Sequence, residues 1–93
     1  MTIHASPEDM HPDSRLQFFA TYLIDGLRKR GVVESKTHHR ALLNSEERKL
    51  VEEMRAKGLC DFGDYELEAA VLYVAAALGF ELNAAKLKKE ILH

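Results

Sequence analysis

The feature that most constrains this chain is an uncharged run of twelve residues, Ala69 to Phe80, in which only the hydroxyl of Tyr73 is polar. Glu68 and Glu81 bound the run. A helix that crosses a membrane needs about 20 apolar residues, and shorter runs are more typical of helices buried in a protein core. The run therefore predicts a buried helix in a cytoplasmic protein that does not associate with a membrane.

The length of 93 residues predicts one domain, because a chain of this size buries roughly 60–65% of its unfolded surface around a single core. Hydrophobic residues make up 46% and charged residues 30%, as in ordinary globular proteins. The single cysteine, Cys60, excludes an intrachain disulfide and a zinc site built on cysteines, and favours a reducing compartment. The polar, acidic N-terminus lacks the pattern of a secretory signal.

Residues 1–12, which hold both prolines, are predicted to form a polar N-terminal tail, and residues 13–93 a single helical domain. In the domain, apolar residues recur at spacings of three and four, as on one face of a helix, and no strand-like alternation is present. The predicted fold is an all-α, compact bundle of four main helices with short connections. The predicted helices span about 13–30, 45–57, 64–78 and 83–92, with a further short helix over 34–43.

Capping residues set these boundaries, because their side chains accept hydrogen bonds from the first backbone amides of a helix. The expected N-caps are Asp13 or Ser14 for the first helix, Asn44 in a capping box with Glu47 for the second, Asp64 for the third and Asn83 for the last.

The predicted helix over 64–78 is apolar on two sides when its residues are placed at about 100° intervals. One side carries the bulky residues of a core stripe, which are Leu67, Val71, Val74 and Leu78. The other side holds Ala69 and Ala76, flanked by Tyr65, Leu72 and Tyr73. The positions left for solvent are Glu66, Glu68, Ala75 and Gly79. A helix that is apolar all round is expected to be buried on all sides.

Two interpretations of the alanine side are open: it packs on the other helices of the chain, or it meets a second copy or another protein. Small residues permit close approach, and tyrosine is enriched in interfaces. Phe18 and Tyr22, four residues apart in the first helix, point away from its core stripe and are a second contact candidate. The alternative is that this pair touches the tail or the connector over 32–43. The predicted interface residues are Phe18, Tyr22, Tyr65, Ala69, Leu72, Tyr73 and Ala76.

No arrangement of residues indicates catalysis. Cys60 is followed by Asp61, and a neighbouring carboxylate disfavours the thiolate that a nucleophilic cysteine needs. The acidic residues between 61 and 68 miss the spacing of an EF-hand. We therefore expect neither enzymatic activity nor a cofactor.

Histidines suggest one alternative function, metal binding. Glu34 and His38 are four residues apart and could supply half a site, whereas the adjacent His38 and His39 diverge by about 100° on a helix. The remaining ligands would have to come from His4, Asp9, His11 or a second chain. No spacing matches a known cage, so no metal site is predicted.

The main alternative is nucleic-acid binding, because residues 71–92 can be laid on a helix-turn-helix. Its second helix would offer polar and basic side chains to a groove, namely Asn83, Lys86, Lys88 and Lys89. The register is imperfect, since Lys88 falls where an apolar residue belongs and Leu87 comes one residue early. The acidic run over 61–68 also adjoins the would-be first helix.

Charge is unevenly distributed along the chain. Residues 28–40 hold five basic residues and one acid, whereas residues 61–68 hold four acids and no base. Such asymmetry orients a bound partner. The predicted function is a small non-enzymatic protein-interaction module, acting as a homodimer or as a regulator or adaptor of a larger protein.

Overall fold

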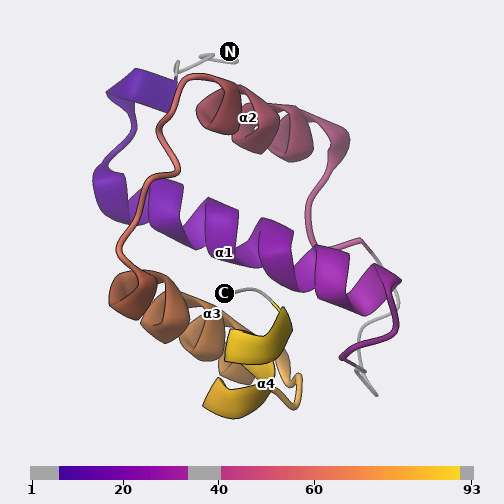
Figure 1. Cartoon of the computed structure of the whole chain (residues 1–93). Coiled ribbons are helices and arrows are strands. Elements are labelled where there is room, and N and C mark those ends of the chain that lie inside the picture. Colours follow the sequence, from indigo (N-terminus) through magenta and orange to yellow (C-terminus); the bar gives the residue numbers. More distant parts are fainter. Residues whose placement is uncertain (1–6, 34–40, 91–93) are drawn as a thin grey trace.

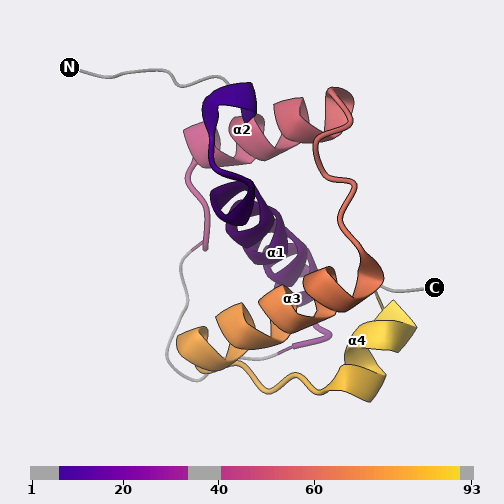
Figure 2. The same cartoon turned by 90° about the vertical axis from the view of Figure 1, so that its left-hand side faces the viewer.

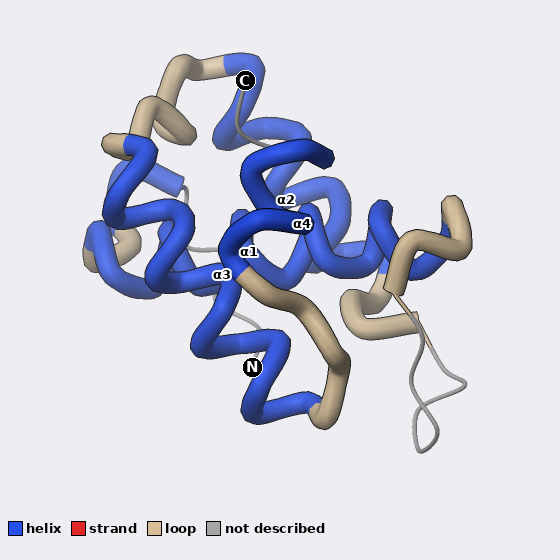
Figure 3. Tube along the Cα trace, turned by 60° about the horizontal axis from the view of Figure 1, so that its bottom comes forward, coloured by secondary structure: helices blue, strands red, loops and turns tan. Residues whose placement is uncertain are grey.

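The computed structural model describes residues 7–33 and 41–90, and all regular structure in these ranges is helical (Figures 1 and 3). The elements are η1 (Pro7–Asp9), α1 (Pro12–Lys29), α2 (Ser45–Ala56), α3 (Asp64–Leu78) and α4 (Ala84–Glu90). The prediction of an all-α fold with four main helices is confirmed. Of the short helix predicted over 34–43, residues 41–43 are not helical and 34–40 lie outside the described residues.

The long helix α1 lies in the middle of the molecule. Helices α2 and α3 pack on opposite sides of it, α4 packs on α3, and η1 packs on α2 (Figures 1 and 2). The core lies mainly between α1 and α3, where fully buried side chains such as Ile24, Leu27 and Val71 meet. Leu87 from α4 closes this core.

The side of α1 that faces α2 carries a buried charge, Asp25, towards the C-terminal end of the helix. Asp25 is only 1% exposed, and its carboxylate lies within 2.7 Å of Arg48 Nη2 in α2. Arg28 and Lys29 lie within 3.5 and 3.4 Å of the same carboxylate, and the backbone N–H of Leu42 donates to it at 3.5 Å. Asp25 therefore ties α1 to α2 and to the segment that leads into α2.

The pKa of Asp25 lies below its ordinary value of 3.8. Burial alone would raise this pKa, but the hydrogen bonds from Arg48 and Leu42 and the positive charges of Lys29 and Arg48 outweigh it. The carboxylate is therefore ionised at neutral pH in spite of its burial.

The capping residues agree with the sequence at two of four helices. Asn44 Oδ1 accepts the Glu47 N–H at 2.8 Å, and Glu47 Oε1 accepts the Asn44 N–H at 2.9 Å, which confirms the capping box of α2. Asn83 Oδ1 accepts the Lys86 N–H at 2.8 Å at the start of α4, as predicted.

The predicted caps of the other two helices are wrong. At α1 the N-cap is His11, whose Nδ1 accepts the Asp13 N–H at 3.1 Å, because Pro12 has its φ preset for the first helical position and lacks an N–H. At α3 the N-cap is Gly63, and Asp64 is already the first helical residue. Asp64 there favours the helix through its charge at the positive end of the helix dipole.

Residues 7–12, predicted to belong to a tail, are part of the packed domain. Pro7 is buried, and η1 lies against α2. Glu8 Oε1 lies 2.8 Å from Lys57 Nζ, which also pairs with Glu53 at 3.0 Å as the spacing of those two residues suggests. The Glu8–Lys57 ion pair holds η1, which precedes α1, against the C-terminal end of α2.

We predict that Asp25→Asn lowers the free energy of unfolding by about 2 kcal/mol at pH 7, because it removes a buried charge that four donors surround. Since the folded-state pKa of Asp25 is depressed, its stabilisation is complete above the unfolded pKa and disappears as the pH falls through the folded pKa. Urea unfolding at several pH values should show the difference from wild type shrinking below about pH 4.

The matched control is Asp61→Asn, at an exposed aspartate, which should change stability by no more than about 0.5 kcal/mol. An equal loss for both variants, or a difference for Asp25→Asn that grows towards low pH, would contradict this account.

Candidate protein-interaction surface

One side of α3 faces solvent and carries apolar side chains. We call it the tyrosine–alanine face and define it by Tyr65, Ala69, Leu72, Tyr73 and Ala76. Tyr65 is 85% and Tyr73 71% exposed, and these are the exposed large hydrophobic residues within the described ranges. Ala69 and Ala76 are exposed, and Leu72 is half-buried at the margin.

The opposite side of α3 is the core stripe that the sequence predicted. Leu67, Val71 and Val74 are buried against α1, and Leu78 is partly buried. Ala75, expected to face solvent, is 1% exposed, because it lies four residues after Val71 and therefore on the same side. The expectation that α3 is buried on all sides is wrong, since α1 and α4 leave its outer side uncovered (Figure 2).

The shape of the tyrosine–alanine face follows from helical spacing. Tyr65, Ala69 and Tyr73 come at intervals of four residues, so each tyrosine lies about 40° from the direction of Ala69 and the two tyrosines are about 80° apart. The tyrosines are separated by about 12 Å along the axis. Ala69 lies midway between the two large rings. The face therefore has a small side chain, that of Ala69, between two exposed rings.

Phe18 and Tyr22 lie on the other side of α1, towards α2, and are half-buried. Arg55 of α2 donates a hydrogen bond from Nη1 to Tyr22 Oη at 3.4 Å, and its guanidinium carbon is 5.8 Å from the centre of the Tyr22 ring. The structure therefore does not bring this pair together with the tyrosine–alanine face, and Tyr22 has a partner within the chain.

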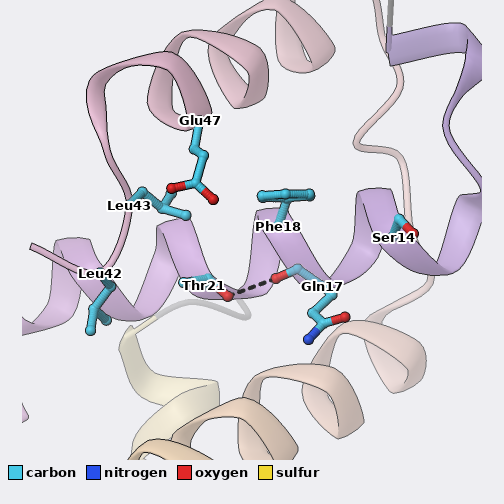
Figure 4. Close-up of a pocket in the computed structure, with 7 residues that line it drawn as sticks. All are labelled: Ser14, Gln17, Phe18, Thr21, Leu42, Leu43 and Glu47. Carbon is cyan, nitrogen blue, oxygen red and sulfur yellow. Dashed lines mark hydrogen bonds between the residues drawn. The ribbon is translucent and has the colours of Figure 1, made fainter. Parts of the chain in front are cut away.

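Phe18 points towards α2 and lines a shallow pocket of about 300 Å³ (Figure 4). The pocket is bounded by Ser14, Gln17, Phe18, Thr21, Leu42, Leu43 and Glu47. Thr21 Oγ1 donates to the Gln17 carbonyl at 2.9 Å, and Glu47 is engaged in the capping box of α2. The hydroxyl of Thr21 and the carboxylate of Glu47 thus already form hydrogen bonds within the helices that line the pocket.

The nucleic-acid candidates lie on and just before α4, which is seven residues long. Lys86, Lys88 and Lys89 are exposed, and Asn83 is exposed but serves as the helix cap. Leu87 is fully buried and Lys88 is exposed. The buried position of α4 therefore comes one residue earlier than in a helix-turn-helix.

The metal candidates are described only in part. Glu34, His38, His39 and His4 lie outside the described residues. Asp9 and His11 are exposed, and His11 caps α1. Within the described part of the chain, no group of three or more His, Cys, Asp or Glu side chains is placed to hold a metal ion.

Cys60 is half-buried, and its pKa is raised. The cause is burial of the thiol, which outweighs the opposing charges of Arg55 and Arg15, rather than the neighbouring Asp61 that the sequence suggested. A raised pKa disfavours the thiolate that a nucleophile requires.

None of the helices in the described ranges combines the length and the apolar content that a membrane span requires.

We predict that the tyrosine–alanine face contributes little to folding. Tyr73→Ser should change the free energy of unfolding by less than about 0.5 kcal/mol, because most of its ring is already in water. Leu67→Ala, on the buried side of the same helix, should cost about 2 kcal/mol or more. Chemical denaturation of both variants checks this, and a large loss for Tyr73→Ser would show that the ring packs within the monomer.

We also predict that duplex DNA is not bound through α4. Phosphate contacts by Lys86, Lys88 and Lys89 would make binding fall steeply between low and moderate salt. Electrophoretic mobility shifts at 50 and 200 mM salt test this for the wild type and for the triple change to glutamine. A salt-dependent shift that the triple variant loses would favour the nucleic-acid alternative instead.

No protein-family model matches this chain, and neither a curated protein nor a solved structure matches it. Inference about function therefore starts from the side chains described above.

Proposed function

We propose that this chain is a small, non-enzymatic protein-interaction module that binds another protein chain through the tyrosine–alanine face. One observation supports the proposal above all. The two large hydrophobic residues that are exposed in the described structure, Tyr65 and Tyr73, lie on the same side of one helix, with Ala69 between them. Single exposed apolar residues are ordinary, whereas an aligned group is typical of a contact surface.

The residue types on this face suit binding. Tyrosine offers a large ring with little conformational freedom to lose and a hydroxyl that keeps a hydrogen bond at the rim. Alanine lets the backbone of a second helix approach closely. Because Tyr65, Ala69, Tyr73 and Ala76 are already exposed, a partner can bind and leave this face without unfolding the module.

The proposal includes a role as a regulator or adaptor of a larger protein rather than an enzyme. Cys60 has a raised pKa, and no metal cluster is present among the described side chains. The cysteine, which is unpaired, fits a reducing compartment, so the proposed location is the cytoplasm.

The proposal is tested with the double change Tyr65→Ser and Tyr73→Ser. Wild type, the double variant and Lys49→Ser, at an exposed position in α2, are each immobilised and exposed to extract from the source cell, with nuclease added. We expect at least one protein that wild type and Lys49→Ser capture equally and that the double variant loses. Equal capture by all three chains contradicts the proposal.

A further inference from the structure

The charged residues of α3 and of the segments that flank it have one sign. No lysine or arginine occurs between Lys57 and Lys86, and the charged residues in that interval are Asp61, Asp64, Glu66, Glu68 and Glu81. All of them are exposed except Glu68, which is half-buried. Among the described residues, no basic side chain lies within ion-pair distance of these five carboxylates.

Two of these acids, Glu66 and Glu68, border the face. At about 100° per residue, Glu66 lies about 60° from Ala69 on one margin, and Glu68 lies about 100° from it on the other. Asp64 adds charge at the same end of the helix. The face is thus an apolar strip with acidic margins, and the acids gather at its N-terminal half.

We propose that the partner presents an amphipathic helix with basic margins, and that one large apolar side chain of this helix sits over Ala69 between Tyr65 and Tyr73. This inference rests on the proposed function and specifies the chemistry of its partner. Lysine or arginine on the margins of the partner helix would meet Glu66 and Glu68, which gives orientation and a faster encounter. The apolar knob would supply the buried centre that an interface needs.

A second copy of the chain fits this face less well. Two α3 helices packed antiparallel about Ala69 would place Tyr65 of each copy beside Tyr73 of the other. The same arrangement places Leu72 opposite Glu66 and Ala70 opposite Glu68, so the α3 helix of a second copy offers no basic side chain to either carboxylate.

The basic helix of this chain does not provide the required partner either. In α4 the lysines Lys86, Lys88 and Lys89 are exposed, but the large apolar side chain Leu87 is fully buried in the core of its own domain. A second copy therefore has no apolar knob on α4 to place over Ala69.

The test uses three synthetic 14-residue peptides as probes. The first places leucines at helical spacing with lysines on the margins, the second replaces each lysine by glutamate, and the third scrambles the first. Binding is measured by fluorescence anisotropy, and the site is mapped by amide chemical shifts of the labelled protein. We expect the leucine–lysine helix to bind at least ten-fold more tightly than either control, with shifts centred on residues 65–76 and weaker binding in 0.5 M salt.

Matched variants distinguish the contribution of the apolar face to peptide binding from that of its acidic margins. Ala69→Arg should abolish binding of the leucine–lysine helix, whereas Ala56→Arg, at an exposed alanine of α2, should not. Glu66→Lys should weaken binding at least five-fold, whereas Glu52→Lys, also exposed on α2, should leave it unchanged.

Three results would overturn the inference: equal binding of the leucine–glutamate helix, chemical shifts that map away from α3, or equal weakening by Glu66→Lys and Glu52→Lys. Sedimentation of the wild-type chain separates this inference from the proposed function. A dimer that Ala69→Arg dissociates would overturn the basic partner while leaving a protein-interaction face in place.

Discussion

Helix α1 packs on α3 through apolar side chains and on α2 around a buried carboxylate, and the arrangement of the other helices depends on these two contacts. Towards α3 it offers Ile24 and Leu27, which join an apolar core. Towards α2 it offers the carboxylate of Asp25, buried and held by Arg48. A buried carboxylate must keep its hydrogen-bonding partners, so the Asp25–Arg48 pair constrains how α2 lies on α1. Asp25 therefore sets the position of α2, and the apolar core supplies most of the stability.

Because α1 occupies the middle, α2 and α3 are separated by it and do not cover each other. Among the described helices, α1 and α4 pack on α3, and neither covers the side that carries Tyr65, Ala69 and Tyr73. The outer side of α3 is consequently left to water, although its composition is that of a buried surface. This is the physical basis of the proposed interaction, since the surface that the monomer does not cover is the surface that a partner can cover.

Sequence reasoning works here where the signal is local. The capping box of Asn44 and Glu47 and the core stripe around Val71 follow from spacing over one or two turns. It fails where the outcome depends on distant segments. Asp25 reads as an ordinary helix charge until Arg48, 23 residues away, is placed beside it. Spacing alone also identifies the alanine side of α3 without revealing whether another helix covers it, and it cannot show that Arg55 reaches Tyr22.

The distribution of aromatic residues has a further consequence for spectroscopy. The chain has three tyrosines and no tryptophan, so its intrinsic ultraviolet emission comes from tyrosine alone. Two of these fluorophores, Tyr65 and Tyr73, are on the outer side of α3, while Tyr22 lies beneath Arg55. Tyr65 and Tyr73 are the more exposed fluorophores, so quenching by a soluble agent such as iodide reports mainly on the solvent exposure of this surface. A partner that covered the proposed face would reduce this quenching, with no label attached.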